Sequence, residues 1–434
     1  MNCYSNITSI ALCYGRVPAR WSTSPLAVPG ASPERRARFM SPSARVVAVT
    51  VVARASTSTA PRRETRSRRR AMTTARASRA VSGVRDLVET HDVFLLDQFG
   101  VLHDGREAYA DAVACVRELK RRGKAVYIIS NSSRRRDGTI RKLEKMGFDG
   151  DAFAGAMTSG ETTARFLECE ATRARRDANA SSAAADELGR GECFDRLRAA
   201  IRDAAASGRK PAFAHATWGD RGAIELGETI REAFEIIRPP FTATTMDSVD
   251  FILAHGTEAF GAGDGAPPTP ASRDDLKALV RAAAERKIPM CVANPDVVTV
   301  SGSELIEMPG TLALWYAEAF AETRPGEDAR AYVCEMGKPD AVIYGALLDE
   351  FGIAKTQSGV GGRRIVAVGD SLAHDIAGGE RAGLDTVFVS GTGIHVDDVR
   401  RVRESEGEDE DDALRRLYDA YGATPTYVVE RLRW

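Results

Sequence analysis

Five short apolar runs, spread over both ends of the chain, constrain its fold more than any other feature. They are DVFLLD (92–97), AVYIIS (125–130), YVCEM (332–336), RIVAVGD (364–370) and DTVFVSG (385–391). Segments with helical periodicity stand between them, at 107–122, at 134–147, at 339–351 and up to residue 382. Buried strands that alternate with helices predict βαβ units, in which helices cover both faces of a parallel sheet.

The middle of the chain holds a second series of the same kind. Its strands are expected at 211–217, 249–256 and 289–294. Residues 171–210, rich in Ala, Arg and Asp, indicate a surface insertion. Within it Phe194, Leu197 and Ile201 have the spacing of one face of an amphipathic helix. The predicted organisation is therefore one α/β domain interrupted by another.

The charge of the chain is distributed unevenly between its first 84 residues and the rest. The whole sequence has 60 basic and 61 acidic residues, but residues 1–84 hold 15 Arg, no Lys and only two acids, Glu34 and Glu64. The remaining residues therefore number 45 basic and 59 acidic, a net charge of −14. An acidic body argues against nonspecific binding of nucleic acid by the folded part.

The Arg- and Ser-rich, acid-poor segment 1–84 has the composition of an organellar transit peptide. We expect an organellar protein, with the chloroplast favoured and the mitochondrion as the alternative. Two other interpretations remain open. The segment is a basic arm that binds nucleic acid, or translation begins at Met40 or Met72, and a start at Met72 would make the protein cytoplasmic. No run of about 20 apolar residues predicts a membrane span.

Several classes of site find no support in the sequence. The seven cysteines show no CxxC pair, which argues against a zinc cage or a disulfide framework. No GxGxxG follows a strand, which disfavours a nicotinamide enzyme. His215 and His255 fall on strands of the second series and are interpreted as structural, because no further ligand lies at metal spacing.

Polar residues stand where the predicted strands of the outer series end. They are Asp97, Ser130 with Asn131, Lys338, Asp370 and Asp375. Each alone is explained equally well as a helix cap, a turn former or a surface residue. Ligands of open parallel sheets, however, bind beyond the carboxyl ends of the strands. Carboxylates beside a lysine and a hydroxyl suit Mg²⁺, which prefers oxygen ligands, together with a phosphate.

In this order the motifs DQFGVL, IISNSS, GKPDAVIYGALL and VAVGDSLAHDIAGGERAG resemble those of the haloacid dehalogenase-like (HAD) superfamily. The large insert between the second and third motifs, with ANPD at 293–296, is similar to the class IIA branch of nucleotidase- and nitrophenyl-phosphatase-like proteins. HATWGDRGAIEL, ILAHGTE and MPGTLALWY further resemble an uncharacterised plant and bacterial subgroup.

The resemblance implies a Rossmann-like, doubly wound parallel-sheet core with a large inserted α/β cap domain. The expected segments are a leader (1–84), the first part of the core (85–170), the cap (171–328, including the low-complexity insertion 171–210) and the second part of the core (329–434). A homodimer formed through the cap is a further expectation.

The same resemblance implies a role for each matching residue. Asp97 would be the nucleophile that forms an aspartyl-phosphate. Ser130 would bind the transferring phosphoryl group with help from backbone amides near Asn131, which would thus take part in substrate binding, and Lys338 would neutralise charge between nucleophile and phosphate. Mg²⁺ would be held by Asp97, Asp370, the main-chain carbonyl of Phe99 and, directly or through water, Asp375. Asn294 and Asp296 of the cap would contact the substrate, a small phosphorylated metabolite.

Phe99 departs from the family pattern. Phosphatases of the superfamily have an aspartate there that protonates the leaving group and then activates water, and phenylalanine does neither. A positioned acid or base contributes about 10²–10⁴-fold to a rate. His103 or Asp104 would have to substitute, or the leaving group would have to be good, as in an acyl phosphate. The alternative is a catalytically weak protein of the same fold that binds a phosphorylated metabolite or has a regulatory role.

Overall fold

A computed structural model describes residues 78–175, 188–220, 226–263, 266–301, 304–353, 364–404 and 409–434. These ranges belong to one compact unit, Ala75–Trp434. The expected leader lies outside them except for its last residues, as does part of the low-complexity insertion. No helix in the described ranges is long and apolar enough to cross a membrane.

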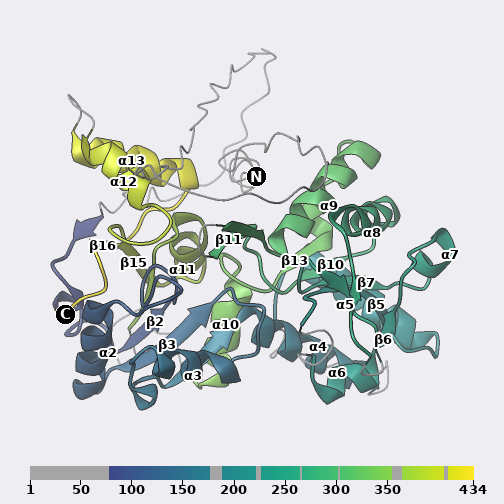
Figure 1. Cartoon of the computed structure of the whole chain (residues 1–434), viewed down its shortest axis with the longest axis horizontal. Coiled ribbons are helices and arrows are strands. Elements are labelled where there is room, and N and C mark those ends of the chain that lie inside the picture. Colours follow the sequence, from purple (N-terminus) through teal and green to yellow (C-terminus); the bar gives the residue numbers. More distant parts are fainter. Residues whose placement is uncertain are drawn as a thin grey trace, which may run out of the picture. The chain divides into compact units, whose positions relative to one another are not determined.

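The first sheet is parallel throughout and contains four of the five buried strands expected from both ends of the sequence (Figure 1). In spatial order its strands are β1 (Arg79–Ala80), β16 (Tyr427–Val429), β15 (Asp385–Val389), β14 (Ile365–Gly369), β2 (Val93–Leu96), β3 (Ala125–Ser130) and β4 (Gly155–Thr158). The chain runs outward from β2 through β3 to β4, and later outward from β14 through β15 to β16. The direction of winding therefore reverses between β2 and β14, and such a switch point is where open α/β sheets bind ligands.

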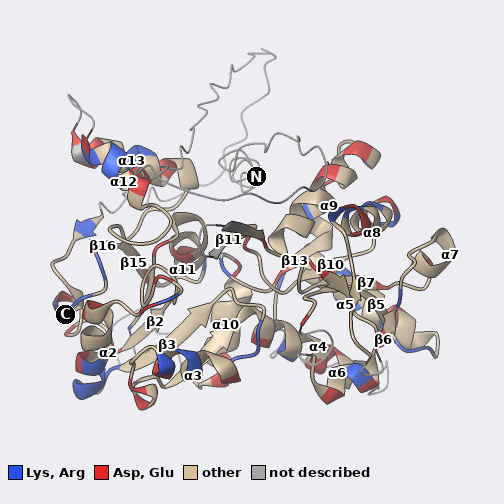
Figure 2. Ribbon diagram, in the orientation of Figure 1, with Lys and Arg blue, Asp and Glu red and all other residues tan. Residues whose placement is uncertain are grey.

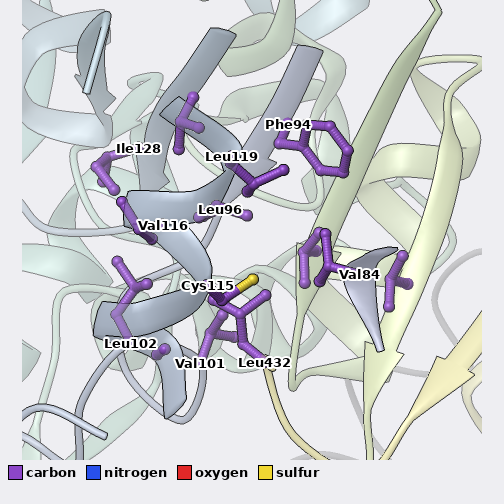
Figure 3. Close-up of a cluster of buried hydrophobic side chains, with 14 of the residues drawn as sticks. Val84, Phe94, Leu96, Val101, Leu102, Cys115, Val116, Leu119, Ile128 and Leu432 are labelled. Atoms are coloured by element: carbon purple, nitrogen blue, oxygen red, sulfur yellow. The ribbon is translucent and has the colours of Figure 1, made fainter. Parts of the chain in front are cut away.

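Strand β2 shows why both faces of this sheet need cover. Phe94 and Leu96 point into one apolar cluster, with residues of α2 (Ala110–Arg121) that include Val116 and Leu119 (Figure 3). Val93 and Leu95 point into another, with residues of α10 (Ala341–Glu350). Because successive side chains of a strand face opposite ways, a continuous apolar run indicates a strand buried on both sides. This confirms the predicted Rossmann-like α/β core.

The other helices that accompany the first sheet are shorter or lie toward its ends. They are η1 (Val84–Asp86), α3 (Asp137–Lys145), η2 (Gly150–Ala152), α4 (Ser159–Arg175), η5 (Leu372–Ile376, a π-helical turn), α11 (Ala377–Arg381), α12 (Val396–Glu404) and α13 (Glu410–Tyr421). Charged residues mark the helices in Figure 2, whereas β2 and β3 carry none. The strands are therefore buried and the helices are solvated, as the alternation of apolar runs and amphipathic segments in the sequence predicts.

A second sheet is built from the middle of the chain. Its order is β13 (Val333–Glu335), β10 (Met290–Val292), β7 (Phe251–Ala254), β5 (Ala212–Thr217), β8 (Ala259–Phe260) and β9 (Thr269–Pro270), and β6 (Glu235–Ile237) also pairs with β5. Its helices are α5 (Glu192–Ala206), α6 (Gly227–Ala233), α7 (Ala243–Met246), α8 (Arg273–Arg286), α9 (Gly310–Thr323) and η4 (Ala329–Tyr332). The hairpin of β11 (Val298–Ser301) and β12 (Glu304–Glu307) follows β10. Phe194, Leu197 and Ile201 of α5 are buried together, as their spacing predicts.

The strand at 332–336 differs from the expectation, which placed it in the core with the other outer runs. β13 instead pairs in parallel with β10, with Cys334 opposite Cys291, and so extends the second sheet. An apolar run predicts a strand, but its partner is decided by packing that the run does not encode. The chain returns to the first sheet only after β13, through the segment that carries Lys338.

Candidate active site

Asp97 follows β2 at the switch point and is buried. Its backbone N–H donates to the carbonyl of Val368 in β14, 2.9 Å away, so the pairing of the two central strands fixes where the carboxylate stands. Asp370 follows β14 directly, and Asp375 lies in the π-helical turn that comes next. Oxygen atoms of the three carboxylates lie within 4.8 Å of one another.

Two glycines make room for Asp370. Gly100 and Gly393 both have positive φ angles, of 75° and 79°. A Cβ atom would come within 2.4 Å of Asp370 Oδ2 at Gly100 and within 1.9 Å at Gly393. Only glycine accommodates both the left-handed backbone and so close an approach. The backbone N–H of Ile394 then donates to Asp370 Oδ2, 2.8 Å away.

Lys338 joins the carboxylates. Its Nζ lies 2.6 Å from Asp97 Oδ1 and 2.6 Å from Asp375 Oδ1, and it also donates to the carbonyl of Ile129 at 3.3 Å. Lys338 is almost completely buried. Burial acts to lower the pKa of Lys338, but Asp375 and Asp97 outweigh it and raise that pKa above its ordinary value. The ammonium group is therefore fixed as a cation beside the two carboxylates.

One ammonium does not balance three carboxylates. Burial raises the pKa of Asp97 to about 7 despite Lys338, and Asp375 acts in the same direction. Burial, with Asp375 and Asp97, also holds the pKa of Asp370 well above its usual range. Clustered carboxylate oxygens with surplus negative charge suit a hard divalent cation. The residues present therefore fit Mg²⁺.

The Phe99 carbonyl is compatible with this metal site. In the turn after Asp97, the N–H of Gly100 donates to the His103 carbonyl, and the N–H groups of Leu102 and His103 donate to Gln98. These bonds do not engage the Phe99 carbonyl, which would still be able to bind a cation.

Ser130 and Asn131 end β3 beside this cluster. Ser130 Oγ accepts from the N–H of Ser132 at 3.3 Å, which leaves its own hydroxyl proton for donation. Asn131 Nδ2 donates to Asp296 Oδ1 at 2.8 Å and to the Lys338 carbonyl at 3.0 Å. Asn131 Oδ1 accepts from the Lys338 N–H at 2.8 Å and from Ser159 Oγ at 3.3 Å.

An amide side chain has two donors and two lone pairs, and all four of Asn131 are used within the protein. Its side chain positions the main chain of Lys338 rather than offering itself to a substrate. The backbone N–H of Asp296 donates to Asn294 Oδ1 at 2.8 Å. The structure thus brings both predicted residues of the cap loop to the edge of the first sheet.

The side chain of Phe99 packs within its own turn, against His103 and Gly105. Its half-buried ring meets the ring of His103 edge-on, with 6.5 Å between centroids. His103 is buried, and burial, with Lys142 nearby, lowers its pKa to about 4. Asp104 Oδ1 accepts from the N–H groups of Arg106 and Glu107, both at 2.8 Å, so this carboxylate caps its own turn.

Three contributions to the site were not predicted from the sequence. The first is Ser159, which completes the bonding of Asn131. The second is the loop after β15, where Thr392 donates to the Gly100 carbonyl and Ile394 reaches Asp370. This loop could have been expected at the site, because it follows β15, the strand next to β14, and loops after neighbouring parallel strands lie at the same edge of a sheet. The third is His374, whose Nδ1 lies 3.7 Å from Asp296 Oδ1.

The predicted structural histidines are buried between the second sheet and the loop after β3. His255 Nε2 lies 2.7 Å from the Ser133 carbonyl, and His255 Nδ1 lies 3.4 Å from His215 Nε2. Trp218 Nε1 donates to Ser133 Oγ at 3.1 Å. His255 therefore connects the second sheet to the loop that follows Ser130 and Asn131, and His215 contacts that loop only through His255.

Known proteins resemble the chain in sequence pattern and in fold. Residues 94–187 match the family described as haloacid dehalogenase-like hydrolase, and residues 335–434 match a family described as HAD-hydrolase-like. No curated protein sequence matches the chain. Three solved structures illustrate the likeness in fold, and all are less than 20% identical to the chain.

In the first two, the similarity extends over nearly all of the other chain. A haloacid dehalogenase-like hydrolase from Brucella suis 1330 is 19% identical, with a TM-score of 0.50 over 81% of this chain and 99% of that one. A possible sugar phosphatase of the HAD superfamily from Cytophaga hutchinsonii ATCC 33406 is 18% identical, with a TM-score of 0.53 over 82% of this chain and 98% of that one. At these identities they show a shared fold.

The third is a glycerol phosphate phosphatase from Mycobacterium tuberculosis, solved in complex with magnesium. It is 17% identical, with a TM-score of 0.46 over 79% of this chain and 76% of that one, and this weaker likeness does not bear on what the chain binds. The two family matches, by contrast, cover the strands that carry Asp97, Ser130 and Asp370 and the segment that carries Lys338. The two segments that build most of the first sheet, residues 94–187 and 335–434, therefore belong to the haloacid dehalogenase-like hydrolase superfamily.

Proposed function

We propose that this protein is a Mg²⁺-dependent hydrolase of a small phosphorylated metabolite, acting through an aspartyl-phosphate at Asp97. One observation carries the proposal: Lys338 lies 2.6 Å from both Asp97 and Asp375, in a buried group that also contains Asp370. Burying a lysine and two carboxylates costs desolvation free energy that their attraction often does not repay, so such a group favours a functional role over a purely stabilising one. Within the superfamily we assign the chain to class IIA, because its second α/β sheet is inserted between Ser130 and Lys338.

Each residue has a separate task in this proposal. Asp97 attacks phosphorus and becomes the acyl phosphate. Ser130 Oγ–H and the backbone N–H groups after it hold the phosphoryl oxygens, and Lys338 keeps negative charge on nucleophile and substrate from repelling each other. Asn131 holds Lys338 in place through its main chain.

The metal is assigned to Asp97, Asp370 and the Phe99 carbonyl, with Asp375 bound directly or through water. When bound, Mg²⁺ supplies positive charge for the phosphoryl oxygens and screens the carboxylates from the anionic substrate. Asp375 is well suited to a supporting part, because its Oδ2 already accepts the N–H of Ser371 at 3.0 Å while Oδ1 accepts from Lys338.

The test is phosphate release by the full-length protein with Mg²⁺ from a panel of sugar phosphates, nucleotides, aryl phosphates and acyl phosphates. Wild type should release phosphate from at least one compound, with loss on chelation, whereas Asp97→Asn should release none. Circular dichroism and Mg²⁺ titration of Asp97→Asn control for folding and for the metal. If wild type and Asp97→Asn are indistinguishable on every compound, the enzymatic proposal fails.

Phe99 favours a second candidate, a catalytically weak protein that binds or senses a phosphorylated metabolite. Its side chain cannot carry a proton, while the metal carboxylates and Lys338 remain in place. This candidate predicts saturable, Mg²⁺-dependent binding of a phosphorylated compound without phosphate release. Calorimetric titration of the same panel separates the two candidates.

A further inference from the structure

The turn that follows the nucleophile contains no side chain that is placed to protonate a leaving group. Phe99 stands two residues after Asp97 and has no transferable proton. Asp104, the nearest carboxylate on the turn, accepts two backbone N–H bonds at its tip and is exposed there. Its position is set by the turn and not by the carboxylate cluster.

His103 does not replace the missing acid. Its Nδ1 accepts the N–H of Gly105 at 3.0 Å, so the ring proton is on Nε2. Nε2 is buried and has no hydrogen-bond partner within the described residues. The ring is only 3% exposed and packs against the edge of Phe99. A proton held there has neither a path from water nor a bond toward the carboxylates.

Two proton-bearing groups beside the carboxylates, Lys338 and Tyr344, already donate within the protein. Lys338 donates to Asp97, Asp375 and Ile129, and Tyr344 Oη donates to the carbonyl of Asp375 at 3.3 Å. Two other residues have a transferable proton. Tyr109, half-buried, follows the turn, and His374 precedes Asp375. The test below therefore includes both.

One exposed apolar side chain, that of Ile394, lies at the edge of the site. Ile394 is 48% exposed, the only large hydrophobic residue in the described ranges with such exposure. Its own N–H binds Asp370, so its side chain cannot be far from the carboxylates. Gly100 lies against Gly393, where an added Cβ would be 2.8 Å from the Gly393 Cα. The loop of Ile394 and the turn of Phe99 therefore form one continuous rim.

From the missing acid and this rim we infer that the substrate is a phosphate derivative with an acidic, apolar leaving group, an acyl or aryl phosphate. The inference rests on the proposed function. A carboxylic acid has a pKa of about 4 and a phenol of about 10, so their anions depart without a proton, whereas an alcohol resembles water at about 16. Sugar phosphates, whose leaving group is a hydrated alcohol, suit neither the missing acid nor the apolar side chain of Ile394.

The chemistry balances without a protein acid. An oxygen of Asp97 forms a bond to phosphorus as the bond to the leaving oxygen breaks, and the electron pair of that bond leaves with the carboxylate or phenolate. Water then attacks the acyl phosphate, the bond between phosphorus and Asp97 breaks, and the Asp97 carboxylate is restored. Both protons of the water leave with the phosphate, as dihydrogen phosphate.

The test is the dependence of kcat/KM on leaving-group acidity, measured with the full-length protein and Mg²⁺. The substrates are phenyl phosphates with substituents from nitro to methoxy, with acetyl phosphate, benzoyl phosphate and an alkyl phosphate at the extremes. Wild type should show kcat/KM falling steeply as the leaving group becomes less acidic. Phe99→Asp should raise kcat/KM for the alkyl phosphate by about 10²–10⁴-fold, and for acyl phosphates by less than about tenfold. Phe99→Leu, the matched apolar control, should keep the steep dependence.

Benzoyl against acetyl phosphate separates the apolar preference from the acidity, and aryl against acyl compounds separates the two sources. Ile394→Ser should raise KM for benzoyl phosphate about fivefold more than it raises KM for acetyl phosphate, and Ile394→Val, which keeps an apolar side chain, should show a smaller difference between the two compounds. Activity with a flat dependence on acidity overturns this inference and leaves the proposed function standing. A dependence that becomes steep only in Tyr109→Phe or His374→Gln overturns it too, because that residue then acts as the acid. If no compound distinguishes wild type from Asp97→Asn, the proposed function itself fails.

Discussion

Removal of Mg²⁺ should destabilise this protein by an amount that grows with pH. In the metal-free protein, burial raises the pKa of Asp97 from 3.8 to about 7, and burial also raises that of Asp370 well above its usual range. A carboxyl group with a higher pKa in the folded than in the unfolded chain binds its proton more tightly when folded. Its contribution to stability is present below the unfolded pKa and is lost as pH rises through the folded pKa.

The size of the effect follows from the shift. A pKa that is about three units higher in the folded than in the unfolded chain corresponds to about 4 kcal/mol of unfolding free energy, which is lost between about pH 4 and pH 7. Lys338 does not offset this loss, because a pKa raised above 10.5 leaves it charged in both states throughout that window. Asp97 and Asp370 share one buried space, so about 4 kcal/mol is the order of magnitude for the site as a whole.

Bound Mg²⁺ selects the ionised carboxylates and should abolish the loss. We expect the unfolding free energy with saturating Mg²⁺ to exceed that with EDTA by little at about pH 5 and by several kcal/mol at about pH 8. Urea denaturation at matched ionic strength, in steps of one pH unit, measures both values. Their difference cancels the pH dependence of the rest of the protein. Asp370→Asn should reduce it at about pH 8. A difference that is absent, or equal at every pH, would refute the reasoning.

The remaining predictions concern the lysine, the asparagine, the phospho-enzyme and the leader. Lys338→Met should abolish phosphate release and lower the metal-free unfolding free energy by about 3–5 kcal/mol, because two buried carboxylates lose their cation, and stability should recover as pH falls. Asn131→Ala should lower kcat much more than it changes KM, because it loosens Lys338, whereas direct substrate contact would raise KM. With acyl phosphates, a burst of released carboxylate equal to the enzyme concentration should precede the steady state, because without a base the phospho-enzyme is hydrolysed slowly. Release of carboxylate that is linear from the start would contradict this. If 1–84 is a cleaved leader, N-terminal sequencing of protein from its native cells should give a start near residue 85, and a start at residue 1 would exclude cleavage.

The sequence predicted the central part of the fold because the signals there are local. Continuous apolar runs at β2 and β14 require cover on both faces, and a polar residue after each run must then lie at one edge of the sheet. The sequence alone therefore predicted that Asp97 and Asp370 lie close together. β13 could not be assigned in the same way, because its apolar run fits the edge of either sheet.

The partners of Asn131 were beyond reach for a different reason. Its four hydrogen bonds go to Asp296, Ser159 and the main chain of Lys338, which are 28 to 207 residues away in sequence. No spacing rule connects such positions, so the sequence indicated a polar residue at a strand end without its bonds. The loop of Ile394 could be expected near the site, because it follows the strand next to β14, but its bond to Asp370 comes from the backbone, so the side chain at position 394 gave no sign of it.

The central claim is that Asp97 carries the phosphoryl group. Acid quenching of the full-length protein a few seconds after mixing with Mg²⁺ and acetyl phosphate, followed by proteolysis and mass spectrometry, tests it directly. We predict one phosphoryl group on the peptide that contains Asp97, sensitive to hydroxylamine as acyl phosphates are, and none in Asp97→Asn. Phosphate release by wild type with no modified peptide, or a phosphoryl group that persists in Asp97→Asn, would contradict the account.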